Sequence, residues 1–157
     1  MKNLISGARR LTAHLDRLQP LGLLVLRLYV SSVFFRSGLV KLSDWGATRA
    51  LFHDEYHVPL LPPDVAAVVG ASGELVFPVL ITLGLAGRFG AAGLFVVNAM
   101  AVISYPQLWG FECPAAIQSH FTWCAILVAL LVFGPGRLSL DALVLRRLGL
   151  PRRPAAT

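Results

Sequence analysis

The stretch Gly70-Ala-Ser-Gly-Glu74-Leu-Val-Phe-Pro78 decides the fold, because it places a single acid inside a long apolar run. Between residues 65 and 86, Glu74 is the only ionisable side chain. About 20 apolar residues in a helix span the hydrocarbon core of a bilayer. An unpaired charge in that core costs roughly 2.5–3.5 kcal/mol on insertion scales. The run therefore predicts a membrane-spanning helix whose carboxyl group is protonated, paired with a cation on a neighbouring helix, or facing a polar cavity.

The composition of the whole chain favours an integral membrane protein. Of its 157 residues, 56% are hydrophobic and 14% are charged, whereas soluble domains average about 45–50% and about 25%. The mean hydropathy is +0.69. In a soluble protein the net charge of +6 would point to nucleic acid. Here the cations lie at both termini and beside the apolar runs, so we expect membrane lipids and no nucleic acid as partners.

Four apolar runs are long enough to cross the membrane, which predicts an all-α, four-helix transmembrane bundle. Pro20 is expected to set the start of the first span, and Gly134-Pro-Gly136 ends the last. A short helix over residues 48–57 is expected in the first loop. The expected membrane domain is 20–148, and its spans are residues 21–42, 65–86, 91–105 and 116–133.

The two ends of the chain differ from this membrane domain. Over residues 1–19 the apolar side chains recur every three or four positions with basic residues mainly on the other side, which predicts an amphipathic helix lying on the cytoplasmic membrane surface. A signal peptide is excluded, because the next apolar run is too long and contains Arg27 and Arg36. Residues 149–157 are expected to form a disordered basic tail.

The distribution of charge orients the bundle. The N-terminal segment, the turn at Arg88 and the C-terminal tail are basic, while the loops at 43–64 and 106–115 are acidic. Positive residues favour the cytoplasmic side. We therefore expect a multi-pass protein of the cytoplasmic (inner) membrane with both termini inside.

Several short motifs, in their order and spacing, resemble the DoxX family of small four-span membrane proteins. The resemblance covers about residues 21–148. The resemblance implies a membrane protein with a redox-linked, quinone-associated role, working beside a protein partner or as a homo-oligomer. It implies no settled reaction and no agreed catalytic residues. The motifs are Leu26-Arg27-Leu28, Ser37-Gly38-Leu-Val-Lys41-Leu42, Gly73-Glu74-Leu75, Leu83-Gly84-Leu85 with Arg88, and Gly134-Pro-Gly-Arg137-Leu-Ser-Leu-Asp141.

The main candidate site combines Glu74 with cations of the first span. At 100° per residue, Ser31, Phe34, Gly38 and Lys41 share the face of Arg27, and Arg36 points the opposite way. By depth, Arg27 or Arg36 is expected to reach Glu74, and Asn98 lies at a similar depth. Lys41 either faces the bundle with Arg27 or extends to the headgroups.

Two interpretations of this site remain open. The pair either fixes the register of two helices or belongs to a pocket for a quinone head group. In that pocket Arg27, Arg36 and Asn98 would donate hydrogen bonds to a carbonyl oxygen, and Glu74, the catalytic candidate, would exchange its proton.

The histidines provide weaker candidates. His120, near the outer end of the fourth span, is either a proton donor or a residue that hydrogen-bonds the outer loop. Haem is not expected, because a second histidine inside the bundle is missing. His53 and His57 are four residues apart and are the weak candidates for a metal contact, completed by Asp54, Glu112 or Cys113. Solvation in the loop explains them better, so no metal is expected.

Three functions compete on this basis. The first is a quinone-linked redox subunit, whose status as an enzyme is open. The second is a non-catalytic membrane anchor or scaffold for a partner protein. The third and weakest is a small-molecule or metal permease, because four spans without an internal repeat lack the machinery of alternating access.

Overall fold

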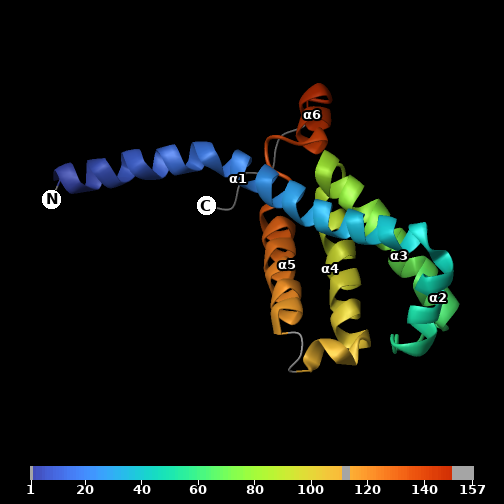
Figure 1. The fold of residues 1–157 in the computed structure, drawn as a ribbon. Helices are drawn as coiled ribbons and strands as arrows, with labels where there is room; N and C mark the ends of the chain where they lie inside the picture. The colour runs from blue at the N-terminus through green and yellow to red at the C-terminus, as the bar shows by residue number, and fades with distance from the viewer. Residues whose placement is uncertain (1, 111–113, 150–157) are drawn as a thin grey trace.

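The computed structural model describes residues 2–110 and 114–149, which form an all-α bundle (Figure 1). Four of its helices are long and apolar enough to cross a membrane. The predicted four-helix bundle is therefore confirmed. The candidate spans are His14–Ser43, Pro63–Leu83, Gly87–Ser104 and Pro114–Phe133.

Helix α1 runs without a break over Lys2–Ser43. The expectation that Pro20 begins the first span was wrong, because Pro20 lies inside α1. Proline removes only one helical hydrogen bond at such a site, and the side chains of residues 14–19 are exposed, so the freed carbonyl group is not buried in the bundle. The candidate span begins at His14, so the basic segment is continuous with it. In Figure 1 the N-terminal part of α1 runs away from the other helices.

Helix α3, over Pro63–Leu83, and helix α4, over Gly87–Ser104, are joined by a tight turn. Gly84 ends α3 at a φ of 65°, which glycine adopts without steric cost. The turn is covered by Asp141, whose carboxylate accepts hydrogen bonds from the N–H groups of Ala86 and Gly87 at 2.9 and 3.1 Å. A carboxylate at a helix N-terminus satisfies free donors there.

The shorter elements close the two ends of the bundle. Helix α2, over Trp45–Asp54, begins and ends three residues before the expected helix, because Asp44 caps it. The 3-10 helix η1 spans Pro106–Trp109, and α5 spans Pro114–Phe133. Helix α6, over Leu140–Arg147, was not expected. The predicted disordered tail lies outside the described residues, apart from Gly149 in a turn after α6.

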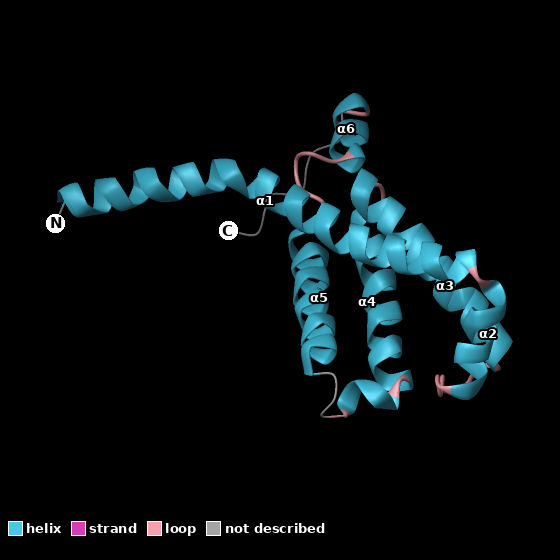
Figure 2. Cartoon of the chain, viewed as in Figure 1, coloured by secondary structure: helices cyan, strands magenta, loops and turns pink. Residues whose placement is uncertain are grey.

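The core lies where α1, α3, α4 and α5 meet, with a short turn between α3 and α4 and with α2 between α1 and α3 along the chain (Figure 2). Helix α1 packs along α3, α3 along α4, and α4 along α5. The buried apolar residues of this core are Leu23, Val30, Phe34, Ile81, Ala91, Leu94, Leu127 and Leu130. The face of α1 predicted to look inward, with Arg27, Ser31, Phe34 and Gly38, is buried as expected.

Helices α1 and α3 approach most closely at Gly38. A Cβ atom added there would lie 2.8 Å from Leu75 Cγ and 3.2 Å from Glu74 Cβ. Gly22, on the same helix, has open space around it. The glycine at position 38 is therefore required by the contact between the two helices.

We predict that Gly38→Ala lowers the free energy of unfolding by about 1–3 kcal/mol, the usual cost of overpacking. The matched variant Gly22→Ala should leave it unchanged or raise it by up to about 1 kcal/mol, because alanine favours helix. Thermal unfolding in mild detergent measures both. Equal stability of the two variants would contradict the close contact.

Candidate functional site

The centre of the site is an ion pair between Lys41 of α1 and Glu74 of α3. The Lys41 ammonium group donates to both carboxylate oxygens, at 2.9 and 2.7 Å, and to Ser37 Oγ at 3.0 Å. The side chains of Lys41 and Glu74 are only 15% and 10% exposed. The carboxylate found in the apolar run is therefore paired with a cation on a neighbouring helix.

The identity of that cation corrects the sequence prediction. Neither Arg27 nor Arg36 bonds Glu74; Lys41 does. Gly38 explains the choice, because it brings α1 against Glu74 and Lys41 follows on the same face less than one turn later. Arg36 is exposed on the opposite side of α1, as its angular position predicted.

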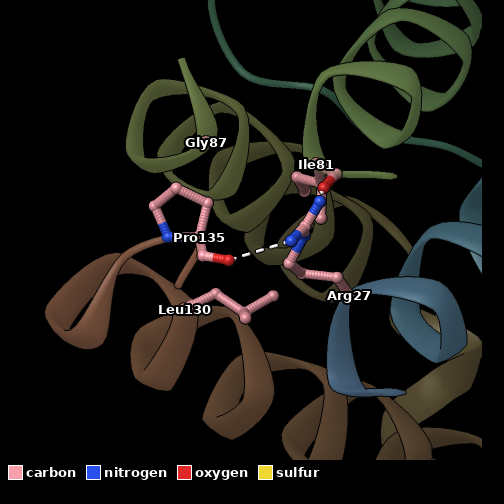
Figure 3. Close-up of a pocket in the computed structure, with 5 residues that line it drawn as sticks. All are labelled: Arg27, Ile81, Gly87, Leu130 and Pro135. Atoms are coloured by element: carbon pink, nitrogen blue, oxygen red, sulfur yellow. Dashed lines mark hydrogen bonds between the residues drawn. The ribbon is translucent and has the colours of Figure 1, made fainter. Parts of the chain in front are cut away.

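Arg27 is buried and donates only to backbone carbonyl groups. Its Nε bonds Ile81 O at 2.7 Å and its Nη2 bonds Thr82 O at 2.6 Å. Its Nη1 bonds the carbonyl groups of Pro135 and Leu138, at 2.8 and 2.7 Å. Figure 3 shows the guanidinium lying between α3 and the Pro135 loop. Arg27 therefore ties α1 to the C-terminal end of α3 and to the loop before α6, and has little capacity left for a ligand.

Asn98 and His120 form a separate polar cluster between α4 and α5. His120 Nδ1 lies 2.7 Å from Asn98 Oδ1, and this amide oxygen can only accept, so Nδ1 carries the proton. The Asn98 amide donates to His120 O and to Cys124 Sγ, at 3.1 and 3.0 Å. Among the residues that the structure describes, no hydrogen bond joins this cluster to Glu74. The expectation that Asn98 shares a pocket with Glu74 is therefore not met, and His120 bonds Asn98 instead of the outer loop.

Aromatic rings stack beside the ion pair at the end of the bundle formed by α2 and η1. Tyr56 stacks on Phe52 and on Tyr105, with ring centroids 4.8 and 5.0 Å apart. The Tyr105 hydroxyl donates to Glu55 Oε2 at 3.0 Å. Burial, and then the negative charge of Glu74, raise the pKa of Tyr56 to about 12. The Tyr56 phenol is therefore neutral at physiological pH and lies within the field of Glu74.

A groove of about 340 Å³ opens at the same end of the molecule. Its walls combine two aromatic rings and two histidines with apolar side chains. The groove adjoins the ion pair through Phe52, whose ring lies against Gly70, one turn before Glu74 on α3. The lining residues are Phe52, His53, Tyr56, His57, Val58, Leu61 and Pro63.

The two histidines of the groove do not share a helix face, contrary to the prediction. Helix α2 ends at Asp54, so His57 lies beyond it. His53 Nε2 lies 3.1 Å from Asp64 Oδ1, and His57 Nδ1 lies 3.1 Å from Glu55 O. Among the described residues, no three or more His, Cys, Asp or Glu side chains lie close enough together to hold a metal ion. Glu112 and Cys113, suggested as additional ligands, lie outside the described part.

Comparison with known proteins places the chain in a family. The DoxX family model matches residues 22–106. The chain belongs to the DoxX family. It is 32% identical over 127 residues to an uncharacterized protein of Haemophilus influenzae, covering 78% of this chain and 82% of the relative. No solved structure matches the chain.

The short sequence motifs of this DoxX protein lie together at two places in the structure. Ser37, Lys41 and Glu74 meet in the ion pair. Arg27 meets the carbonyl groups of the 134–141 segment, whose Asp141 caps α4. At the first place the carboxylate of Glu74 keeps acceptor positions free, whereas the second place is a closed structural joint. The candidate functional site is therefore the Lys41–Glu74 pair.

Sequence reasoning missed two members of this site. Ser37 precedes Lys41 by four residues, a spacing that puts both side chains on one helix face, and this signal was available. Tyr56 reaches the site because α2 folds back along α3. The spacing of residues in the sequence does not indicate that α2 packs against α3.

We predict that either Glu74→Gln or Lys41→Met lowers the free energy of unfolding by about 3 kcal/mol, because each leaves a charge in an apolar setting. The double variant Lys41→Met/Glu74→Leu should recover most of that loss. A double-mutant cycle in mild detergent measures the coupling between the two side chains. Additive losses would show that the two side chains do not interact.

Proposed function

We propose that this DoxX protein is a redox-linked component of a membrane complex and binds a quinone head group beside the Lys41–Glu74 pair. The observation that carries the proposal is a buried carboxylate near the middle of α3 that is paired with Lys41 and keeps acceptor positions free. Intramembrane acids mark ligand or proton pathways more often than they mark plain packing.

The hydrogen bonds at the pair leave groups that suit a head group. Lys41 uses three donor contacts on Ser37 and Glu74, and a carboxylate has about four acceptor positions. Glu74 therefore has capacity left to accept a hydrogen bond from a hydroxyl of a reduced head group. Ser37 accepts from Lys41, which leaves its own proton to donate to the carbonyl oxygen of an oxidised one.

The adjoining groove supplies the apolar part of such a site. Its Phe52 and Tyr56 rings offer flat surfaces for a planar ring. The neutral Tyr56 phenol adds a donor near Glu74. Arg27 and Asn98 are engaged elsewhere, so the proposed site consists of Ser37, Lys41, Glu74 and Tyr56.

A bound quinone would supply two-electron, two-proton chemistry. The residues of this chain bind and orient the head group, and Glu74 exchanges a proton with it. A partner redox protein of the complex carries the electrons. In this proposal the chain is a quinone-linked oxidoreductase component.

We expect protein purified in mild detergent to retain near one quinone per chain, measured by mass spectrometry of its lipid extract. Glu74→Gln should lose it, because a neutral amide is a poor proton acceptor. Ser37→Ala, which keeps both charges, should retain several-fold less. The exposed acid Asp54 provides the matched control, and Asp54→Asn should behave as wild type.

Background quinone in all four samples would reject the head-group site. That result would favour the second candidate, a non-catalytic anchor for a partner protein. The length of α1 favours this alternative, because its N-terminal part extends beyond the helices of the bundle and leaves residues 14–19 exposed.

We also propose that both termini face the cytoplasm of an inner membrane, with the basic N-terminal part of α1 on its surface. The support is the charge pattern and the sideways exit of this part from the bundle (Figure 1). The candidate span begins at His14, which supports the alternative that the residues from His14 onward are inserted into the membrane.

Single cysteines in a background without Cys113 and Cys124 test this orientation. An impermeant maleimide should label Leu60→Cys from outside, and should label Arg146→Cys only after the cytoplasmic side is opened. His14→Cys should follow Arg146→Cys. Protection of His14→Cys on both sides would place it inside the membrane instead.

A further inference from the structure

Helix α1 carries an arginine on the side that no other helix covers. Arg36 is exposed and, among the described residues, has no hydrogen bond or ion pair. The other two cations of this stretch are both bonded, Arg27 to four carbonyl groups and Lys41 to Ser37 and Glu74. The residues that share its side of the helix are also exposed and form what we call the Arg36 face: Val25, Tyr29, Ser32, Arg36, Val40 and Ser43.

The packing of α1 on α3 gives the depth of Arg36. Gly38 lies against Glu74 and Leu75, which are near the middle of the 21-residue α3. Arg36, two residues away, lies seven residues before the end of α1 at Ser43, which is about 10 Å along the helix axis. It is therefore about two turns inside the candidate span. Side chains of a helix lean toward its N-terminus, so Arg36 leans away from the nearer end of α1 and is poorly placed to reach the headgroups there.

The energetic consequence is a binding preference. A free arginine inside the hydrocarbon core is energetically unfavourable. A carboxylate on a neighbouring helix would offset that cost and bond the guanidinium in bidentate fashion. Ser32, whose hydroxyl is already bonded to Tyr29 O at 2.8 Å, is a small residue that permits close helix approach.

A second copy of the chain does not provide that carboxylate. In the described spans the acids are Asp16, Asp64 and Glu74. Glu74 is paired with Lys41, Asp64 is paired with Arg49 at the outer end of α3, and Asp16 is 20 residues from Arg36 on the same helix. A symmetric pair using this face would bring two Arg36 side chains together.

We propose that the Arg36 face binds a transmembrane helix of a different protein, which presents an aspartate or glutamate near the middle of the membrane. Charge complementarity selects the partner, and the exposed serines and apolar residues of the face form the packing surface. This docking surface is on the side of α1 opposite the inward face of Gly38. It does not depend on quinone binding.

A designed peptide replaces the unidentified helix in the test. The peptide is a Leu/Ala transmembrane helix with one central glutamate, and its control has glutamine there. Energy transfer between labelled full-length protein and labelled peptide is measured in neutral phosphatidylcholine vesicles. We expect the glutamate peptide to bind about tenfold more tightly than the glutamine peptide, within the range of measured interhelical polar contacts.

Variants of Arg36 decide the cause of that preference. Arg36→Gln should abolish it, and Arg36→Glu should transfer it to a peptide with a central lysine. The matched control Arg146→Gln, a basic residue of α6, should retain the wild-type preference. Thermal unfolding confirms that each variant is folded, which we expect because Arg36 makes no contact that its loss would break.

Four outcomes would overturn the proposal. One is equal binding of the two peptides, and another is a preference that persists in Arg36→Gln. The third is a preference removed by adding anionic phosphatidylglycerol, which would assign Arg36 to lipid phosphate. The last is energy transfer between two labelled copies of the chain that is lost in Arg36→Gln. That result would show that this face binds a second copy of the chain and not a helix of a different protein.

Discussion

Inside a hydrocarbon layer a charge must be matched, and the part of α1 from Arg27 to Lys41 carries three cations with three different environments. Lys41 is matched by a carboxylate on α3. Arg27 is matched by four backbone carbonyl groups. Arg36 is left on the outer face of the bundle. The arrangement of the helices follows from the first two, because each ties α1 to an element distant in sequence.

The two matched cations have different roles, one structural and one in the candidate functional site. Arg27 bonds the end of α3 and the segment before α6, at a joint closed by Pro135 and capped by Asp141. A guanidinium satisfied in this way adds rigidity and has little capacity for a ligand. The Lys41–Glu74 pair differs, because its carboxylate keeps acceptor positions free. This remaining hydrogen-bonding capacity and the adjoining groove distinguish the pair from a purely structural one.

Sequence reasoning predicted the spans well and their contacts poorly, for different physical reasons. Hydropathy is summed over about 20 residues, so the membrane segments are robust to local error. A side-chain pair depends on the crossing of two helices, which a few glycines decide. Lys41 was placed on the correct face of α1, but depth counted from the sequence favoured Arg27 and Arg36. The glycine at position 38 brings α1 against Glu74, one turn from Lys41.

From the sequence alone came the number of spans, the inward face of α1, and the need of Glu74 for a partner, since these depend on periodicity and on the cost of a buried charge. The tertiary structure alone decided that Lys41 is that partner, that Tyr56 comes beside it, and that Arg27 bonds carbonyl groups of the loop before α6. Each of these joins residues that are distant along the chain. These contacts depend on how closely the helix backbones pack in space, and the spacing of residues along the chain does not predict that packing.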